Sequence, residues 1–464
     1  MSSLFSLLGT MGSALSAQQE GLNVTGQNVS NVNTPGYVDQ RVVMETNGTG
    51  DDSDGGVNAT VQSTFDAFTY GQVLTQQGLS GAANARSEAL NEAQNVVAPQ
   101  GGDDVGSEMT SFFSSLEALS ANPSDSSARS GVLASAQAVA QTFSSAANGL
   151  AQQQASLLSQ AQGVATQVNS DLSQIATLNG QIAQNTASGN PSPDLSDQLD
   201  SVVGDVANLV GASVVQNPSG GVTLFAAGVA LVSGDSASAL DVSAGPTGAM
   251  QITVNQPGAA PTDVTSNITE GTLGGLREAR DVDIAQSASQ LDQLAYGFAN
   301  AVNAVQQSGY GLDGVTGRPL FTPPTQVAGA AANMSVDASV AGQPNAIAAT
   351  ANPQDLPGGN DSVLALEQVA NQSLGGGGTP SQQYAALTSQ IGNAASAAST
   401  EATTRSETLT QAQNLNSSAS GVSLNEETVN MTQFQQAFEA ATQVLTVASD
   451  LLGNFISQMS GTTA

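Results

Sequence analysis

Hydrophobic residues follow a heptad spacing at both ends of the chain. Near the C-terminus, apolar side chains recur at alternating intervals of three and four residues. These positions are Met431, Phe434, Phe438, Ala441, Leu445, Ala448, Leu452, Phe455 and Met459. Leu424 extends the stripe upstream, although Glu427 occupies the position between. The pattern predicts a helix with one apolar stripe.

A second stripe with the same spacing begins close to the N-terminus. It contains Leu4, Leu8, Met11, Leu15, Leu22 and Val29, with Gln18 and Thr25 as polar members. Either stripe could be the core-facing side of an ordinary helix. However, one stripe buries too little apolar area to offset the entropy of ordering its own helix. Each helix therefore needs a partner, and the two could pair within a subunit, between subunits, or in both ways.

Between the ends, long helical tracts alternate with segments rich in turn residues. The tract 129–185 contains no proline, and it repeats apolar residues at heptad spacing with Asp171 as a polar exception. It predicts a long helix in an antiparallel bundle, preceded by a break at 122–125. Further helices are expected from about Asn84, from Ser107, and at 195–210, 273–307, 362–373 and 380–419.

A different texture begins after residue 211. Residues 212–215 and 222–225 flank a Pro- and Gly-containing turn, which predicts a β-hairpin. Residues 229–232 and 251–254 are further strand candidates, so a small β-rich region is expected over about 211–270. The segment 310–362 is rich in Gly and Pro, with a short strand predicted at 334–336. Residues 47–56 indicate an exposed loop, and 61–79 carry no clear element.

These elements predict a mainly α fold with inserted β structure. The N- and C-terminal parts form a long antiparallel helical bundle, and a small β-rich domain lies in the middle. We expect the two termini side by side. The predicted units are 1–40 (N-terminal assembly helix and turn), 41–190 (loop and long-helix bundle), 191–365 (β-rich middle with a helix at about 273–307), 366–422 (second part of the bundle) and 423–464 (C-terminal assembly helix).

Charge and composition exclude several classes of function. Seven basic residues face 38 acidic ones, which gives a net charge of −31 and disfavours binding to nucleic acid or to anionic membranes. Cysteine and histidine are both absent, so disulfides, the usual zinc sites and imidazole catalysis are excluded. No segment approaches a membrane span, and the N-terminus lacks a conventional signal peptide. We expect a protein that is not an enzyme and that binds no metal or cofactor.

One acidic cluster is the strongest candidate for chemistry. Asp194, Asp197, Asp200 and Asp205 lie on one predicted helix, where carboxylates could serve glycoside hydrolysis or hold calcium. The chain has no Trp and only five Tyr, so an aromatic-lined sugar site is not indicated. A solvated helix face explains the cluster more simply. A secreted carbohydrate-active or adhesive protein remains the alternative from another functional class.

The two ends also carry a recognisable pair of motifs. Residues 22–37 read LNVTGQNVSNVNTPGY, and 420–427 read SGVSLNEE, followed by FQQAF at 434–438. Together they resemble the terminal signature of flagellar rod, hook and hook-associated proteins. Within that group, three internal features resemble the FlgK family: DLSDQLD at 194–200, LGGL at 273–276 with Arg280-Asp281 and the following helix, and the long helical region before residue 190.

Two departures from the family pattern accompany this resemblance. The chain is shorter than many members, which suggests a reduced outer β domain, and Leu199 stands where the family usually has arginine. Rod and hook subunits usually carry an Ala-Gln-Arg-like run where this chain has Phe434, Gln435 and Gln436. A hook or distal rod subunit is therefore the nearest alternative.

The resemblance implies a structural subunit at the junction of hook and filament. It implies export through the flagellar type III apparatus without a cleaved signal, and an extracellular position at the distal end of the hook. It also implies terminal segments that are disordered in the monomer and ordered on assembly. Expected partners are copies of itself in a helical or ring layer, the hook protein, a second hook-associated protein, and an export chaperone at the C-terminal segment. The expected assembly interface comprises both apolar stripes with Leu424, Asn31, Thr34, Gly36 and Tyr37.

Overall fold

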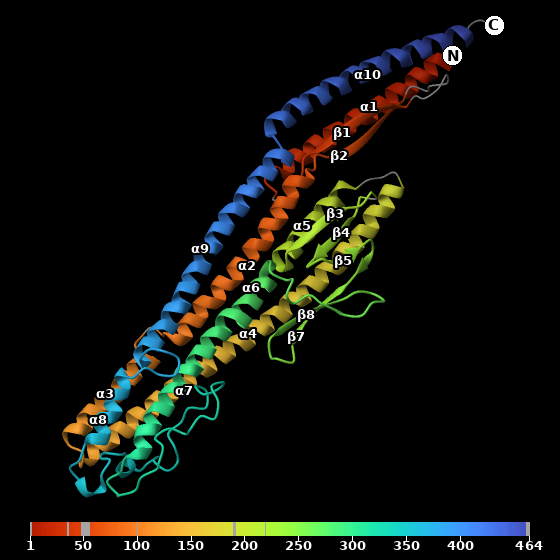
Figure 1. Ribbon diagram of the computed structural model, residues 1–464. Coiled ribbons are helices and arrows are strands. Elements are labelled where there is room, and N and C mark those ends of the chain that lie inside the picture. Colours follow the sequence, from red (N-terminus) through yellow and green to blue (C-terminus); the bar gives the residue numbers. More distant parts are fainter. Residues whose placement is uncertain are drawn as a thin grey trace.

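The molecule is elongated, and both termini lie at the same end (Figure 1). The computed structural model describes residues 2–34, 37–47, 56–99, 101–188, 192–218 and 220–460. At the terminal end, α1 (Ser2–Asn31) runs antiparallel to α10 (Leu424–Ser460). Below them, α2 (Ala67–Val97) runs antiparallel to α9 (Pro380–Ser420). The predicted bundle of N- and C-terminal parts is confirmed.

Local capping explains where the next helices begin. Helix α3 (Val105–Ala121) starts behind Asp104, whose carboxylate accepts a 2.8 Å bond from the Ser107 backbone. Ser107 is thus the third helical residue, closing a reciprocal capping box. Helix α4 (Ser126–Ala187) starts behind Asp125 in the same manner. The predicted break before a long proline-free helix is confirmed.

The later helices match the predicted tracts, with one irregularity. Helix α5 spans Pro193–Val210, and α8 spans Asp361–Gln368, followed by a 3₁₀ turn. The predicted helix at 273–307 consists of α6 (Gly271–Glu278), a π-helical segment (Ala279–Ile284) and α7 (Ala285–Ser308). Side chains of the π-helical segment form hydrogen bonds with several neighbouring elements, as described below.

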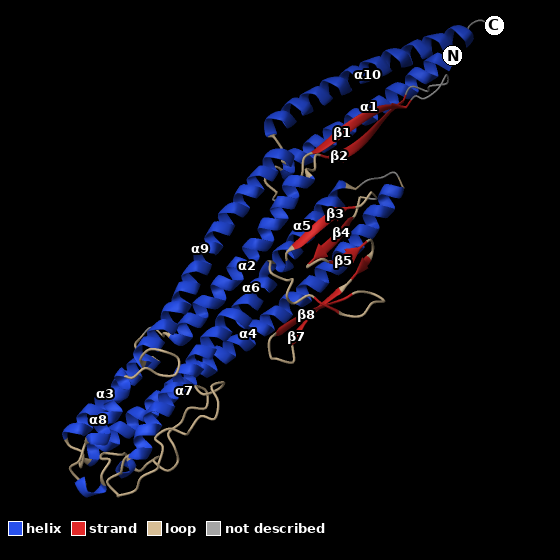
Figure 2. Ribbon diagram, in the orientation of Figure 1, coloured by secondary structure: helices blue, strands red, loops and turns tan. Residues whose placement is uncertain are grey.

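Three small antiparallel sheets complete the fold (Figure 2). One contains β1 (Gln40–Asn47) and β2 (Gly56–Ser63) and packs on α1. The second contains β3 (Ala212–Gln216), β4 (Val222–Ala226), β5 (Val229–Ser233) and β6 (Ser236–Ala237). The third contains β7 (Ala239–Ala244), β8 (Met250–Asn255) and β9 (Thr262–Asp263). The predicted β-rich middle is confirmed, including the β3–β4 hairpin.

Two local expectations need correction. Helix α2 begins at Ala67 rather than near Asn84, because the Asp66 carboxylate accepts 2.9 Å bonds from the backbone amides of Phe68 and Thr69. No strand forms at 334–336; this segment makes only an isolated bridge between Phe321 and Val336. The expected loop at 47–56 falls mostly outside the described residues.

Two asparagine side chains on the helices hydrogen-bond both backbone groups of a residue in a neighbouring strand or loop. Asn303 on α7 donates to the Phe321 carbonyl at 2.8 Å and accepts from the Phe321 amide at 2.9 Å. Asn179 binds both backbone groups of Val222 in the same way, at 2.8 Å each. Such paired bonds hold loop and sheet backbone against the helices, where buried N–H and C=O groups need partners.

The hydrophobic core lies entirely in the body of the molecule. Its large contiguous cluster runs from α2 through the sheets to α8 and α9, and it includes no residue of α1 or α10. Among the described side chains of those two helices, the buried hydrophobic ones are Ala17, Val24 and Ala448. None of the helices, over the residues described, is long and apolar enough to cross a membrane. The terminal pair is therefore a separate, thinly packed unit.

Candidate assembly site

The two terminal stripes face each other within one chain. Helices α1 and α10 are in extensive contact along their lengths. The half-buried members of the stripes are Leu8, Met11, Leu15, Leu22, Val29, Met431, Phe434, Phe438, Ala441, Leu445 and Leu452. Leu424 and Phe455 stay 50% and 48% exposed. The side chains of Leu4 and Met459 lie outside the described residues. The intramolecular pairing that the sequence left open is thus present.

A glycine sets the closest approach of the two helices. A Cβ atom placed on Gly21 would lie 2.6 to 2.8 Å from three ring carbons of Phe434. The Phe434 ring therefore lies directly against the α1 backbone, in a hole that only glycine leaves open. Neighbouring Ala17 and Val24 are buried beside this contact on the same face of α1. The sequence stripes include Phe434 but give no role to Gly21.

A polar network centred on Asn28 fixes the register about two turns further along α1. The Asn28 side chain is fully buried and donates to Asp39 at 2.9 Å, to the Gln40 carbonyl at 2.8 Å and to Glu427 at 3.2 Å. Its oxygen accepts from the Tyr37 hydroxyl at 3.0 Å and from the Gln40 amide at 3.2 Å. One amide thus joins α1, the turn that follows it, β1 and α10.

Beside this network, the backbone just before β1 is hydrogen-bonded to the end of α9. The Asp39 amide donates to the Ser420 carbonyl at 2.8 Å, and the Asp39 carboxylate pairs with Arg41 at 2.9 Å. Arg41 also lies 3.5 Å from Glu426, where both side chains are exposed and the pair contributes little. The Asp66 amide donates to the Ser420 hydroxyl at 3.2 Å. These bonds join the terminal unit to the body.

The residues at the end of α1 and in the turn that follows, 31–37, have different roles at this junction. Asn31 donates to the Gln27 carbonyl at 3.1 Å and Thr34 donates to Asn31 at 3.3 Å, and these local bonds shape the end of α1. Tyr37 reaches the buried Asn28. Gly36 lies outside the described residues. Glu427, which interrupted the apolar stripe, is only 3% exposed and is the partner that the network requires. A charged residue inside an apolar stripe was the available signal.

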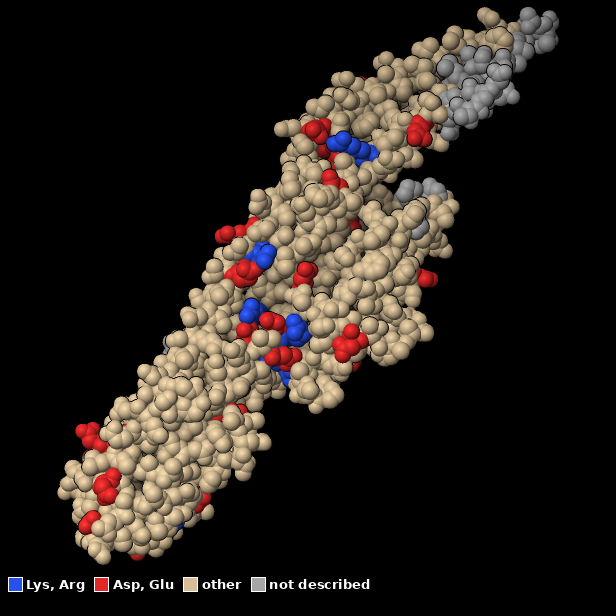
Figure 3. Space-filling model, viewed as in Figure 1, with Lys and Arg blue, Asp and Glu red and all other residues tan. Residues whose placement is uncertain are grey.

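Helix α10 also leaves large apolar side chains exposed, both on the stripe that faces α1 and outside it. Seven large hydrophobic side chains on α10 are exposed, half of the fourteen in the described structure: Leu424, Val429, Val444, Val447, Leu451, Phe455 and Ile456. Charge is scarce here, since Glu20 is the only charged residue of α1 and Glu439 and Asp450 are the only ones beyond Glu427 in α10. On the face seen in Figure 3, the described part of this end is mostly tan, with a few acidic groups and a basic group toward its base. Such a surface suits contact with other subunits.

The acidic cluster of α5 lies in a cleft below the terminal unit. The cleft has a volume of about 710 Å³ and is lined by α5, the start of α2, the end of α9 and the turn after α1. Burial raises the pKa of Asp200 to about 7, with a contribution from Asp197, and burial with Asp194 raises the pKa of Asp197 to about 6. Burial, with the charges of Asp197, Asp194 and Asp39, raises the pKa of Tyr37 to about 12.

The arrangement of these carboxylates does not identify a metal centre. Over the described residues, no group of three or more acidic side chains is placed to hold a metal ion. Asp194 itself is exposed and is not among the residues lining the cleft. Tyr70 instead donates a 2.9 Å bond to the Asp200 backbone carbonyl, tying α2 to α5. The cluster therefore belongs to a junction between helices.

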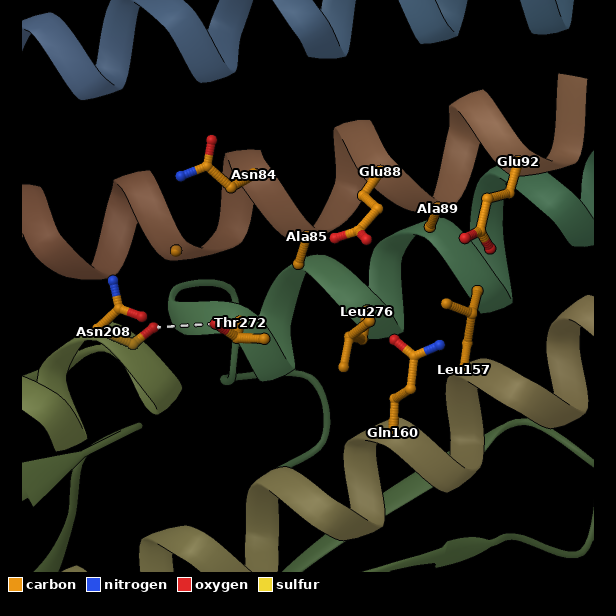
Figure 4. Close-up of a pocket in the computed structure, with 11 residues that line it drawn as sticks. Asn84, Ala85, Glu88, Ala89, Glu92, Leu157, Gln160, Asn208, Thr272 and Leu276 are labelled. Atoms are coloured by element: carbon orange, nitrogen blue, oxygen red, sulfur yellow. Dashed lines mark hydrogen bonds between the residues drawn. The ribbon is translucent and has the colours of Figure 1, made fainter.

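A smaller cavity of about 210 Å³ lies where α2 crosses α4, α5 and α6 (Figure 4). Glycines let these helices approach closely: a Cβ on Gly275 would lie 2.1 Å from the Ala82 carbonyl, and one on Gly81 2.2 Å from the Asn208 carbonyl. In Figure 4, Glu88 and Glu92 enter its open side from α2. The LGGL motif thus serves helix packing, and the cavity is what remains beside the crossing.

The neighbouring Arg280-Asp281 motif joins three elements. Arg280 donates to the Gln154 carbonyl on α4 at 3.0 Å and to the Gly248 carbonyl at 2.8 Å, and it pairs with Asp281. Asp281 also accepts from the Met250 amide at 2.9 Å. These bonds radiate from the π-helical segment and place β7 and β8 against the long helix.

Comparison with known proteins decides among flagellar subunits. The two ends match models of the flagella basal body rod protein (residues 8–37) and of the flagellar basal body rod FlgEFG protein C-terminal region (413–459). Residues 90–321, half of the chain, match the helical domain of the flagellar hook-associated protein FlgK. The chain belongs to the FlgK family.

Full-length relatives agree with this assignment. Flagellar hook-associated protein 1 of Bacillus subtilis is 30% identical, with 99% of both chains covered. That of Salmonella typhimurium is 28% identical, with 96% of this chain and 98% of its own covered. The structure of the flagellar hook junction protein FlgK from Burkholderia pseudomallei has the same fold, with a TM-score of 0.66 and 19% identity over 75% of this chain and all of its own.

Membership in the FlgK family settles the general role. The chain is a structural subunit of the bacterial flagellum, of the hook-associated kind that joins hook to filament. The rod-type matches at its ends show that the α1 and α10 segments are shared with other flagellar subunits. The match to the FlgK helical domain covers the middle of the chain, from within α2 to just beyond α7.

Proposed function

We propose that α1 and α10 enter the flagellum as one preformed helical pair, which packs against the pairs of neighbouring subunits. The body, from α2 to α9 with its sheets, then forms the outer part of the junction. The interface residues are the two stripes with Leu424, Asn31, Thr34, Gly36 and Tyr37. Asn28 and Glu427 hold the pair in register, so that each subunit presents the same surface.

One observation carries this proposal. The terminal pair spans more than sixty residues, yet its described side chains include only three buried hydrophobic ones, while seven large ones on α10 are exposed. An isolated helical pair gains stability chiefly from apolar burial, so this pair buries too little apolar surface to be stable by itself. Contacts with other subunits would cover the exposed apolar side chains of α10 and bury the apolar surface that the pair alone leaves in solvent.

The distribution of charge supports the same mode of assembly. A net charge of −31 makes copies of this chain repel one another. The surface of the terminal pair away from the Asn28 network holds only Glu20, Glu439 and Asp450 as charged groups. Subunits can therefore approach closely along α1 and α10, whereas their acidic bodies are kept apart. Repeated contacts of this kind are heterologous and build helical layers.

The remaining expectations concern partners and export. We infer contacts with the hook protein on one side and a second hook-associated protein on the other, and an export chaperone that covers the α10 segment before assembly. The exposed apolar stripe of α10 supports the last of these, because such a surface needs protection in solution. We infer an extracellular position at the distal end of the hook, reached without a cleaved signal, and no enzymatic role.

Deletion of 425–464 tests the assembly proposal. The deleted chain should retain its body, because the main core cluster includes no residue of α10, and should fail to join flagella. Circular dichroism and thermal unfolding check the body, and immunolabelling of isolated flagella checks incorporation. Label at the distal end of the hook from a folded deleted chain contradicts the proposal. For the full-length chain, label spread along the whole hook contradicts the junction position.

The alternative in which the acidic cluster is a catalytic or adhesive site has its own test. Replacing Asp194, Asp197 and Asp200 together with alanine would abolish such an activity. We expect the triple variant to assemble at the hook like the unaltered chain, because all three side chains lie on α5 rather than on α1 or α10, and Asp197 and Asp200 line a cleft inside the subunit.

A further inference from the structure

A groove on the outside of the body lies where α2 begins and α9 ends. It has a volume of about 580 Å³ and lies between the first turns of α2 and the last turns of α9. The two helices are held together there by the Thr69 hydroxyl, which bonds Asn416 at 2.8 Å. Phe68 and Leu415 stand at its two edges with 72% and 49% of their surface exposed. Phe68 is the most exposed large hydrophobic side chain in the described structure.

The lining of this groove is unusual for so acidic a chain. Its ten residues are Ala67, Phe68, Gly71, Gln72, Thr75, Gln76, Thr408, Gln411, Ala412 and Leu415, and none of them is charged. Nothing lies within 4 Å of the position that a Cβ on Gly71 would occupy, so one wall of the groove is open backbone. A helical ridge of apolar side chains can approach such a wall closely.

The same chain carries a ridge of that kind. Val444, Val447 and Leu451 lie at intervals of three and four on α10, and they are 44%, 59% and 55% exposed. The ridge is free of charge, as is the groove, so two chains of net charge −31 can meet there with little electrostatic cost. A basic partner is not indicated, since the groove offers no carboxylate to bind it.

We propose that the groove between Phe68 and Leu415 receives the α10 ridge around Val447 from a neighbouring copy of this chain. The inference rests on the proposed assembly through the terminal pair and names one of its contacts. Groove and ridge are different surfaces of one molecule, so the contact is heterologous, and each copy can receive one neighbour and enter another. The contact therefore propagates along a layer instead of closing on itself.

Disulfide trapping tests this contact in assembled flagella, and the chain has no cysteine of its own to interfere. The double variant Gly71→Cys with Val447→Cys is produced in place of the unaltered chain, and isolated flagella are oxidised mildly. The matched control pairs Val447→Cys with Gly163→Cys, an exposed helical glycine that, like Gly71, has nothing within 4 Å of its Cβ position. Each single variant is treated in parallel.

We expect covalent dimers, trimers and larger species from the Gly71 pair in flagella, at least tenfold more than from the Gly163 pair. Single variants should remain monomeric or stop at dimers. Absence of species larger than monomer from an incorporated Gly71 pair overturns the inference, as does an equal yield from the Gly163 pair. Incorporation of the variants into flagella tests the assembly proposal, whereas the yield of cross-linked species tests this contact. Failure of the contact with normal incorporation therefore leaves the assembly proposal standing.

A second pair of variants avoids dependence on introduced cysteines. Phe68→Gln and Leu415→Gln make the groove edges polar, and both side chains are too exposed to be needed for folding. Val327→Gln, at a side chain 40% exposed on a loop of the body, is the control. We expect the two groove variants to lower the number of subunits per flagellum several-fold and the control to leave it unchanged. Normal incorporation of both groove variants would sink the proposed contact.

Discussion

Asn28 donates a hydrogen bond to Glu427, which lies 399 residues further along the chain, and both side chains are buried. The same amide also donates to Asp39 and to the Gln40 carbonyl, so one side chain ties α10 to α1 and to the strand that follows it. Buried polar groups of this kind fix register, since any slip leaves them without partners. The buried contact between Asn28 and Glu427 therefore sets the register of the two terminal helices within a mainly apolar seam.

Replacing this amide by a carboxylate should disengage the terminal pair. Asn28→Asp removes the donors to Asp39, Gln40 and Glu427 and places a third carboxylate beside two others. We expect the pair to lose about 2–4 kcal/mol of stability, with the body unaffected. Hydrogen exchange of residues 8–31 and 424–458 measures this. Asn23→Asp adds the same charge at an exposed position of α1 and should leave exchange unchanged; equal effects from both would refute the role of the network.

A methyl group at Gly21 should disturb the seam in a second, independent way. Gly21→Ala forces the ring of Phe434 away from α1 and is expected to cost the pair about 1–3 kcal/mol through overpacking. Gly26→Ala on the same helix meets nothing within 4 Å and should stabilise it by about 0.5–1 kcal/mol. Proteolytic cleavage rates within α10 distinguish the two. Protection of both variants to the same degree would contradict the contact.

Much of the architecture follows from the sequence because the signals are periodic. The stripes, the proline-free tract that became α4 and the hairpin at 212–226 depend on local patterns that one chain displays in full. The start of α2 was missed although Asp66 marks it, because the following residues carry a weak apolar pattern. Likewise, β1 and β2 were not expected, since their faces are only half-buried against α1.

The contacts of the assembly site were harder to foresee. Gly21 and Phe434 meet across more than 400 residues of chain, and no spacing rule relates them. The side chains Asn28, Asn179 and Asn303 each bind the backbone of a distant segment. Asparagine in a helix is otherwise an unremarkable polar residue, and its role depends on which carbonyl and amide the fold brings near. Only tertiary structure carries that information.

Mild acid should stabilise the body of the protein. Asp197 and Asp200 have pKa values raised to about 6 and about 7, above the ordinary 3.8 of an unfolded chain. The folded state therefore binds protons more tightly, and its stability rises as the pH falls from about 7 toward 4. Urea unfolding should give a free energy of unfolding about 2 kcal/mol larger at pH 5 than at pH 8.

The source of this pH dependence can be isolated by substitution. The double variant Asp197→Asn with Asp200→Asn should abolish most of the slope between pH 5 and 8. Asp241→Asn, which removes one exposed carboxylate from β7, should keep it. A slope that survives the double variant would assign the effect to other groups.

The paired hydrogen bonds between Asn303 and Phe321 should stabilise the loop region 309–360. Asn303 is 4% exposed and holds both backbone groups of Phe321. Asn303→Asp loses the donor to the Phe321 carbonyl and buries a carboxylate, at an expected cost of about 2–4 kcal/mol. Hydrogen exchange over 309–360 should rise accordingly. Asn333→Asp makes the same change at an exposed position within the loop and should have little effect; similar exchange in both variants would exclude this stabilising role of Asn303.

Association between copies should strengthen as salt is added. The net charge of −31 opposes association at low ionic strength, while the terminal pair that joins the subunits is nearly uncharged. Raising NaCl from about 10 to 150 mM shortens the screening length from about 30 to 8 Å and removes much of the repulsion between the acidic bodies. Sedimentation velocity of the full chain should then show a larger associated fraction, and sodium sulfate of equal ionic strength should act similarly. The chain deleted for 425–464 should stay monomeric throughout. Association that weakens steadily over this range would mean that attraction between charges, rather than apolar contact along α1 and α10, holds the copies together.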